Sequence, residues 1–134
     1  YEGEWVNGKQ TGTGTFNWSD GDKYKGAWVN GERTGTGIYE FSNGNVYDGE
    51  WVNGKEHGQG SYTWKSGIKY VGQWKNDDKH GQGTFTWPSG NKYMGQWKYD
   101  KQHGQGTKTY KSGKIEKGIW ENGKFMYAQG TQNP

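Results

Sequence analysis

Aromatic residues alternate with single intervening residues along the whole chain. In the second unit, Tyr24, Gly26 and Trp28 are separated by one residue each, and Tyr39 and Phe41 follow with the same spacing. Side chains that recur at every second position lie on one face of a β-strand, whereas a helical face needs a spacing of three or four. The pattern therefore predicts short strands throughout the chain.

The alternating stretches recur with a period of 23 residues. Each period contains Tyr-x-Gly-x-Trp, then Gly-x-Gly, then two aromatic residues one position apart, then a turn glycine. A fixed period of this length is typical of repeat architectures, in which each unit contacts only its neighbours. We expect one array over 1–127, with five full repeats over 1–115, a partial sixth over 116–127 and a polar tail over 128–134.

Two kinds of hairpin connect the predicted strands. Residues 19–21, Ser-Asp-Gly, match a three-residue loop that ends in a left-handed glycine. Folding the chain about this loop pairs Phe16 with Tyr24 and Gly12 with Trp28. The same arithmetic applies to the corresponding loop of every later repeat.

The second hairpin spans residues 6–11. Folding the chain about it pairs Trp5 with Gly12 and Gly3 with Gly14. Both foldings place the same residues on one face, so the two registers agree. The sequence predicts an all-β fold, an elongated antiparallel sheet of tandem 23-residue β-hairpin repeats.

Three columns of residues should run across one face of this sheet. The first is mostly aromatic, the second is all glycine, and the third alternates Trp with Gly, so each indole should lie across neighbouring glycines. Glycine permits sharp bending, so we expect the sheet to curl along the glycine column into a trough. The structural aromatic face comprises Tyr1, Trp5, Phe16, Tyr24, Trp28, Tyr39, Tyr47, Trp51, Tyr62, Tyr70, Trp74, Phe85, Tyr93, Trp97 and Trp120.

These motifs resemble the MORN (membrane occupation and recognition nexus) repeat. The resemblance rests on Tyr-x-Gly-x-Trp-x-x-Gly at residues 24–31 and Gly-x-Gly at residues 35–37, and it extends over 1–115. Asp77 and Asp100 depart from the pattern because each replaces a loop glycine. The resemblance implies a repeat scaffold, and it also raises a membrane-adaptor function, since such repeats occur beside phosphatidylinositol phosphate kinase domains and in junction-forming proteins.

The composition supports an aromatic core. Leucine is absent, and aromatic residues make up 17% of the chain within a hydrophobic total of 27%. Because each buried aromatic ring removes about 150–250 Å² from water, the rings can replace the missing aliphatic core. There is no cysteine, which excludes disulfides and thiolate chemistry.

Catalytic and metal-binding patterns find no support in the sequence. His57, His80 and His103 share the context His-Gly-Gln-Gly one repeat apart. Equivalent positions in alternate strands are about 10 Å apart, which is too far for one zinc ion whose ligand nitrogens lie at about 2.0–2.1 Å. We interpret them as surface residues of the loops. We expect no enzyme activity, metal or cofactor.

The charge distribution is uneven. The net charge is +3, with four basic and six acidic residues over 1–46 against seven basic and three acidic over 93–134. Lysines near an anionic membrane contribute about 1 kcal/mol each, although these are spread over both edges and both faces of the predicted sheet. Candidate contacts for an acidic partner are Lys98, Lys101, Lys108, Lys111, Lys114, Lys117 and Lys124.

The leading functional hypothesis is a non-catalytic scaffold for protein–protein interaction or self-association, with dimers through a sheet edge or face. The first alternative is a peripheral adaptor that binds acidic phospholipids, and the second is carbohydrate binding through exposed aromatic rings. Nucleic acid is not expected as a partner. A cytoplasmic or membrane-peripheral location is favoured.

The register also predicts how the array ends. Lys108 should pair with Glu116 where earlier repeats pair two rings, forming an exposed opposite-charge pair. Phe125 and Tyr127 should fold over Trp120 as a terminal cap.

Overall fold

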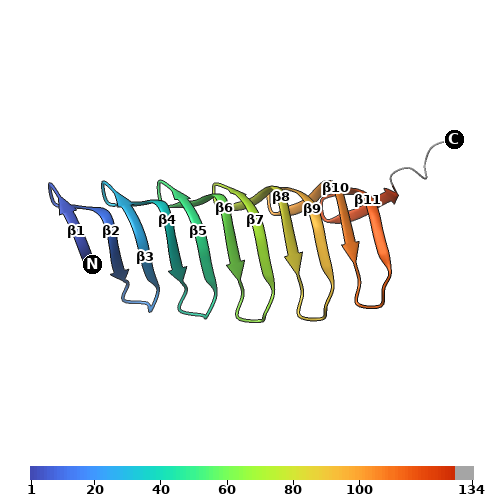
Figure 1. Cartoon of the computed structure of the whole chain (residues 1–134), viewed down its shortest axis with the longest axis horizontal. Helices are drawn as coiled ribbons and strands as arrows, with labels where there is room; N and C mark the ends of the chain where they lie inside the picture. The colour runs from blue at the N-terminus through green and yellow to red at the C-terminus, as the bar shows by residue number, and fades with distance from the viewer. Residues whose placement is uncertain (129–134) are drawn as a thin grey trace.

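The computed structural model describes residues 1–128, which form twelve antiparallel strands in one open sheet (Figure 1). Each strand pairs with the next one in the chain. The strands are β1 (Glu2–Val6), β2 (Lys9–Asn17), β3 (Lys23–Val29), β4 (Glu32–Glu40), β5 (Val46–Val52), β6 (Lys55–Thr63), β7 (Lys69–Lys75), β8 (Asp78–Thr86), β9 (Lys92–Lys98), β10 (Lys101–Thr109), β11 (Ile115–Glu121) and β12 (Lys124–Ala128).

The three-residue hairpin loops have the predicted form. The N–H of Gly21 donates to the carbonyl of Trp18 (3.1 Å), and the N–H of Trp18 donates to the carbonyl of Asp22 (3.0 Å). Gly21 has a φ of 102°, which only glycine adopts readily. The register across this loop is also confirmed, with Phe16 opposite Tyr24.

The second kind of hairpin is tighter than the sequence suggested. Asn7 and Gly8 form a two-residue turn with φ of 51° and 77°, the left-handed geometry of a type I′ turn. In two later repeats an aspartate occupies the glycine position, and Asp77 and Asp100 adopt φ of 71° and 66°. The turn therefore tolerates the two departures from the repeat pattern.

The predicted pairing of Trp5 with Gly12 is wrong. Gly3 does pair with Gly14, but the register then shifts and Trp5 pairs with Gln10. The shift occurs at Gly12, whose φ of 64° turns the backbone away from the pairing geometry of a strand. As a result, β2 has two more residues than β1 at this point, which is a β-bulge. The same shift recurs between β3 and β4, β5 and β6, β7 and β8, and β9 and β10.

Side chains on the outer face close these bulges. In the first repeat, a carboxylate oxygen of Glu4 accepts the N–H of Thr13 (3.1 Å). In the fourth, the amide oxygen of Gln73 accepts the N–H of Gln82 (2.7 Å). Ala27 holds the corresponding position of the second repeat, and its side chain has no oxygen that could accept this hydrogen bond.

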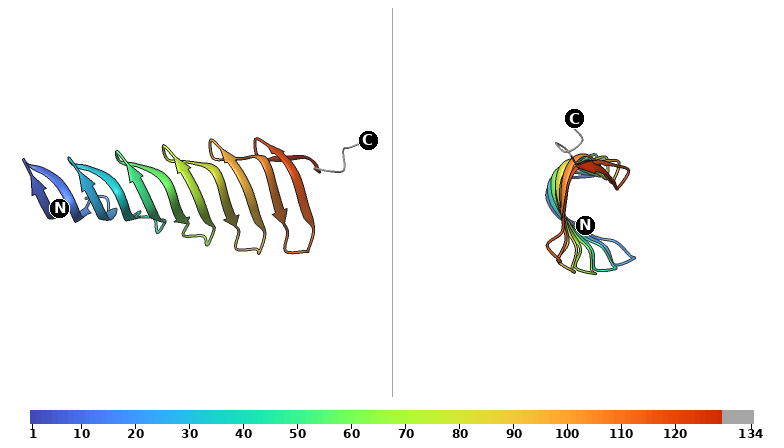
Figure 2. Two further views of the ribbon diagram at one scale, coloured as in Figure 1. Left: turned by 45° about the horizontal axis from the view of Figure 1, so that its top comes forward. Right: turned by 90° about the vertical axis from the view of Figure 1, so that its right-hand side faces the viewer.

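The sheet curls into an open trough, whose cross-section is seen along its axis in the right panel of Figure 2. Paired glycines form a column across the sheet, as expected. The ring that covers them is a tyrosine. The indoles were predicted to cover the third column of glycines, where a Cβ added to Gly35 would instead meet Ala27. A Cβ added to Gly37 would lie 2.1 Å from the hydroxyl oxygen of Tyr24 and one added to Gly26 would lie 2.4 Å from the Cα of Gly37, so neither position accepts a side chain.

The tryptophans bury their rings on the concave face. Trp28 and Trp51 are each 4% exposed, whereas Val29 and Val52 next to them are 50% and 43% exposed. The valines lie on the convex face because neighbouring residues of a strand point in opposite directions. This confirms the predicted facing of these strands.

The end of the array matches the prediction only in part. Lys108 does pair with Glu116 across β10 and β11, but no ion pair forms between them, because Lys108 lies over the ring of Trp87 at 4.9 Å. Phe125 packs on Trp120 with 5.2 Å between ring centroids, while Tyr127 is exposed. Ala128, the first residue of the predicted tail, belongs to β12, and the rest of that tail lies outside the described residues.

Candidate functional site

The concave face is built on a tyrosine from each repeat. Tyr24, Tyr47, Tyr70 and Tyr93 are completely buried. Each hydroxyl donates to the carbonyl three residues later, for example Tyr47 to Glu50 (2.8 Å). Burial raises the pKa of these phenols, to about 12 for Tyr24 and Tyr93, so the rings stay neutral and anchor the face.

Each tryptophan connects its repeat to the one before. The indole N–H of Trp51 donates to the carbonyl of Gly37 (3.1 Å). Its ring centroid lies 5.0 Å from that of Tyr47 in its own repeat and 5.5 Å from that of Tyr24 in the preceding repeat, and both contacts are edge-on. The quadrupoles of aromatic rings favour this arrangement. Trp5, in the first strand of the sheet, has no such outer neighbour and is 53% exposed.

The bulge places a row of polar residues on the same face. Because the register shifts by two residues, each tryptophan pairs with a polar residue where a glycine was expected. A shift of two keeps a side chain on its face, so these residues point into the trough. The row consists of Gln10, Arg33, Glu56, Lys79 and Gln102.

Arg33 lies in a cage of four aromatic rings. Its guanidinium carbon is 4.9 Å from the ring centroid of Trp51 and 5.1 Å from that of Tyr39. Trp18 and Tyr24 complete the cage at 5.6 and 5.9 Å. A cation within about 6 Å of an aromatic face is attracted by the ring quadrupole.

Each cation of the row also has a polar partner. Nη2 of Arg33 donates to the carbonyl of Gly54 (2.8 Å). Two repeats along, Nζ of Lys79 lies 3.1 Å from a carboxylate oxygen of Asp100 and 5.4 Å from the ring centroid of Trp97. A cation in this face is therefore stabilised by rings on several sides and an oxygen on another.

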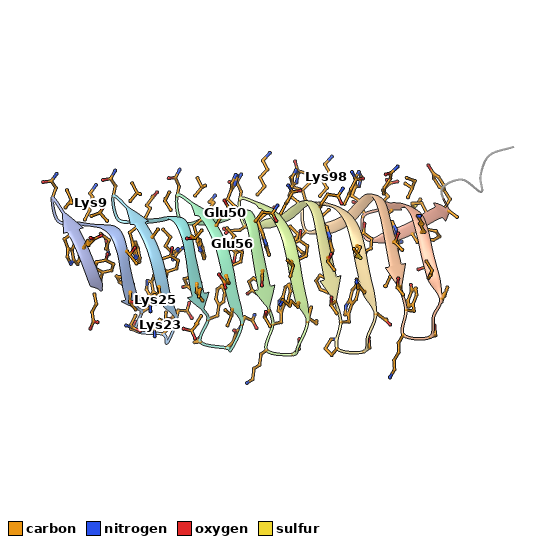
Figure 3. The ribbon with its side chains drawn as sticks, in the orientation of Figure 1. Lys9, Lys23, Lys25, Glu50, Glu56 and Lys98 are labelled. Carbon is orange, nitrogen blue, oxygen red and sulfur yellow. The ribbon has the colours of Figure 1, made fainter. Side chains whose placement is uncertain are left out.

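Glu56 lies between these two cations in the row and differs from both. It is 7% exposed, and Figure 3 shows it on β6 in the middle of the array. Its backbone is held by Asp77, whose carboxylate accepts the N–H of Glu56 (2.8 Å) and whose N–H donates to the Glu56 carbonyl (3.0 Å). No hydrogen bond or ion pair forms at its own carboxyl group within residues 1–128.

The environment of Glu56 opposes ionisation of its carboxyl group. Burial, followed by the negative charges of Asp77 and Asp100, raises the pKa of Glu56 from 4.5 to about 8. The positive charges of Arg33 and Lys79 act in the opposite direction and have smaller effects. The local charges therefore favour a positive group beside this carboxyl.

A cavity of 420 Å³ opens next to Glu56. Polar groups from four consecutive repeats, including Arg33, Lys79 and Asp100, lie around it. Its apolar wall is made by the rings of Tyr39, Phe41, Trp51, Tyr62, Trp64 and Trp74. A concave, mostly aromatic wall with a few polar groups is typical of binding pockets.

One edge of the trough carries half-buried rings. One aromatic residue of each repeat holds this position, and its ring packs on the buried rings of the concave face. These residues are Trp18, Phe41, Trp64 and Trp87. The ring centroids of Trp64 and Tyr62, for example, are 4.4 Å apart. Part of each ring is open to solvent. The edge can therefore contact a bound molecule as well as the core.

The lysines considered for an acidic partner do not gather on one surface. Lys98 and Lys101 flank a two-residue turn at the edge of the trough, where Figure 3 labels Lys98. Lys111 begins a three-residue loop at the opposite edge, and Lys114 follows that loop. Lys108 lies over aromatic rings, while Lys117 in β11 and Lys124 in β12 are exposed.

The histidines are strand residues and not loop residues. His57, His80 and His103 lie in β6, β8 and β10 and are half-buried. No group of three residues able to hold a metal ion occurs among residues 1–128. The same residues include no helix long and apolar enough to cross a membrane.

The polar row and the cavity were not predicted from the sequence. The signal available was a charged or amide residue two positions before each Gly-x-Gly motif, as at Arg33 and Glu56. Recognising that Gly35 and Gly58 have positive φ would have shifted the register and placed these residues on the aromatic face.

Comparison with protein families matches one model, described as MORN repeat, to five consecutive segments, residues 1–23, 24–46, 47–69, 70–92 and 93–115. The segment boundaries coincide with the repeats read from the sequence. The comparison with curated proteins found no match.

Proposed function

The chain belongs to the MORN repeat family, and from this we propose that it is a non-catalytic scaffold that binds a polypeptide in its trough. The family is generally a non-catalytic repeat scaffold that binds protein or membrane. The observation that carries the protein-binding proposal is the 420 Å³ cavity in the middle of the aromatic face. Aromatic residues dominate the binding energy of protein interfaces when they fill or form such pockets.

The shape and charge of the trough fit a chain segment. Its concave face runs along the length of the array (Figures 1 and 2), and Arg33, Glu56 and Lys79 follow one another at the spacing of one repeat. One repeat is two strands, or about 10 Å. That spacing corresponds to about three residues of an extended peptide or two turns of a helix.

Placement of the lysines gives less support to a phospholipid surface. Only lysines that approach one plane together gain from a membrane, and Lys98 and Lys114 lie at opposite edges of the trough. Within residues 1–128, β1 is an edge strand of the sheet, and pairing of such an edge with a second copy supports self-association as a further route of assembly.

Selection of peptides tests the proposal. A displayed library of random peptides is selected on the intact chain, and the enriched peptides are measured against two matched variants. Trp64→Ser alters the edge of the trough, and Met94→Ser alters an exposed residue of the convex face. We expect binding to fall at least about tenfold for Trp64→Ser, as for an aromatic hot spot, and to stay unchanged for Met94→Ser.

Equal effects of the two variants would contradict a trough site. Vesicles of phosphatidylcholine with and without phosphatidylserine provide the competing outcome. Co-sedimentation that requires phosphatidylserine and weakens as salt rises, without any peptide bound in the trough, would favour the membrane adaptor.

A further inference from the structure

Equivalent cages of aromatic rings recur along the array, and the side chain inside them differs from repeat to repeat. Around Arg33 the cage consists of Trp18, Tyr24, Tyr39 and Trp51. A step of 46 residues gives the rings around Lys79, which are Trp64, Tyr70, Phe85 and Trp97. Both cages are therefore occupied by a cation from the chain itself.

The cage between them holds a carboxyl group instead. A step of 23 residues from the Arg33 cage reaches Phe41, Tyr47, Tyr62 and Trp74. Three of these rings, those of Phe41, Tyr62 and Trp74, line the 420 Å³ cavity together with Glu56. This cage therefore has aromatic faces and an acid but no cation of its own.

The neighbouring cations do not neutralise Glu56. Arg33 donates to the carbonyl of Gly54, and Lys79 is paired with Asp100. The carboxyl group of Glu56 lines the cavity and makes no hydrogen bond or ion pair within residues 1–128, so an incoming partner with hydrogen-bond donors and positive charge can pair with it. Glu56 is more than nine-tenths buried and lines the cavity.

We propose that this cage binds an alkylammonium group, the end of a lysine side chain of the polypeptide in the trough. Lys79 is the internal template for the geometry. Its ammonium lies 3.1 Å from a carboxylate oxygen of Asp100 and between 5.4 and 5.9 Å from four ring centroids. The incoming ammonium takes the same place in the cage of Glu56, with the carboxylate as its oxygen partner.

Binding of the cation is coupled to release of a proton. Glu56 is largely protonated at neutral pH because burial and nearby carboxylates raise its pKa to about 8. A cation favours the ionised carboxylate, so it lowers this pKa and binds more tightly as pH rises towards 8 and beyond. The other charged or titratable groups that act on or respond to Glu56 are Arg33, Tyr47, Tyr62, Asp77, Lys79 and Asp100.

Titration with n-butylammonium chloride tests the site without any peptide. The whole chain is labelled with ¹⁵N, and the indole N–H signal of Trp74 is followed, with sodium chloride at matched ionic strength and 1-butanol as controls. We expect saturable shifts with n-butylammonium that are stronger at pH 9 than at pH 6. Equal shifts with 1-butanol would overturn the proposal, because an uncharged alkyl group would then suffice.

Three variants separate the cage from general charge effects. Glu56→Gln keeps the shape and removes the charge, so n-butylammonium should bind at least about tenfold more weakly, as expected when one partner of a buried charge pair is lost. Glu56→Lys should abolish binding because its own ammonium fills the cage. Glu40→Gln removes an equal charge from an exposed residue and should leave binding unchanged.

An unchanged affinity in Glu56→Gln, with its spectrum otherwise like that of the wild type, would overturn the proposal. The proposal rests on the trough accepting a polypeptide, but the two can fail separately. Trough-bound peptides that keep their affinity after lysine is replaced by norleucine would refute the ammonium site alone. Binding of n-butylammonium without any trough-bound peptide would refute the polypeptide alone.

Discussion

Replacing Trp51 by alanine tests whether the repeats are held together by indoles that reach into the preceding hairpin. Trp51 is 4% exposed, donates its indole N–H to Gly37 (3.1 Å) and meets the rings of Tyr24 and Tyr47 edge-on. Truncating a buried aromatic residue costs about 3–5 kcal/mol because the lost contacts leave a cavity. The total stability of a natural domain is about 5–15 kcal/mol, so this loss should release the contacts between two repeats.

Trp5 offers a matched control within the same chain. It holds the same position of the repeat but is 53% exposed, and within residues 1–128 its aromatic contact is with Tyr1, at 4.9 Å between ring centroids. Trp5→Ala should therefore cost clearly less than Trp51→Ala, because it removes one aromatic pair, worth about 0.5–1.5 kcal/mol beyond area burial, and only about half as much buried surface.

Hydrogen exchange is the suitable assay because repeat arrays unfold in parts. Guanidinium titration of both variants supplies the free-energy difference, and peptide-level exchange locates it. For Trp51→Ala we expect loss of protection in β4 to β6 first. Equal destabilisation by the two substitutions, or unchanged exchange in β4 to β6, would refute the packing described for Trp51.

Three further predictions follow from the bulges, the buried acid and the last strand. The raised pKa of Glu56 means that the folded state binds this proton more tightly than the unfolded state, so the contribution of Glu56 to stability should be fully present below pH 4.5, fall progressively towards pH 8 and then level off. The difference in guanidinium midpoint between the wild type and Glu56→Gln should fall over this range, and a difference that rises instead would contradict the prediction. Ala27→Gln supplies an acceptor to the N–H of Thr36, and thermal denaturation should show a gain of about 0.5–1.5 kcal/mol. No gain would count against a stabilising effect of the hydrogen bonds that close the bulges in other repeats, such as that from Gln82 to Gln73. Deleting 124–134 removes β12 and uncovers Trp120, so light scattering should show aggregation, whereas a soluble chain with unchanged fluorescence would show that β12 is no cap.

Much of the fold could be predicted because one period of 23 residues constrains every strand at once. The pairing of Phe16 with Tyr24 followed from the three-residue loop, and the glycine column followed from both hairpins. The prediction failed at Gly12, because a glycine in a strand pattern can either extend or form a bulge and the spacing alone does not distinguish the two. The error was the same in each repeat, since the same glycine recurs.

The candidate site depended on that one error. With the wrong register, Arg33 and Glu56 had no place on the aromatic face, so neither the cages nor the cavity could be expected. Ring orientation was also beyond the pattern, which shows that Tyr24 and Trp28 share a face but not that the tyrosine covers the glycines. Close contacts such as that between Gly37 and the Tyr24 hydroxyl emerge only from three-dimensional packing.

The central claim is that the concave face is the binding surface, and chemical shifts that report on both faces at once test it most directly. Trp64 and Trp74 line the cavity and each has an indole N–H group whose signal can be followed, and Met94 carries a methyl group on the convex face, where it is exposed. With ¹⁵N in the indoles and ¹³C in the methionine methyls, a trough-bound peptide should shift the Trp64 and Trp74 signals and leave Met94 unchanged. Shifts at Met94 with unchanged indole signals would contradict the account.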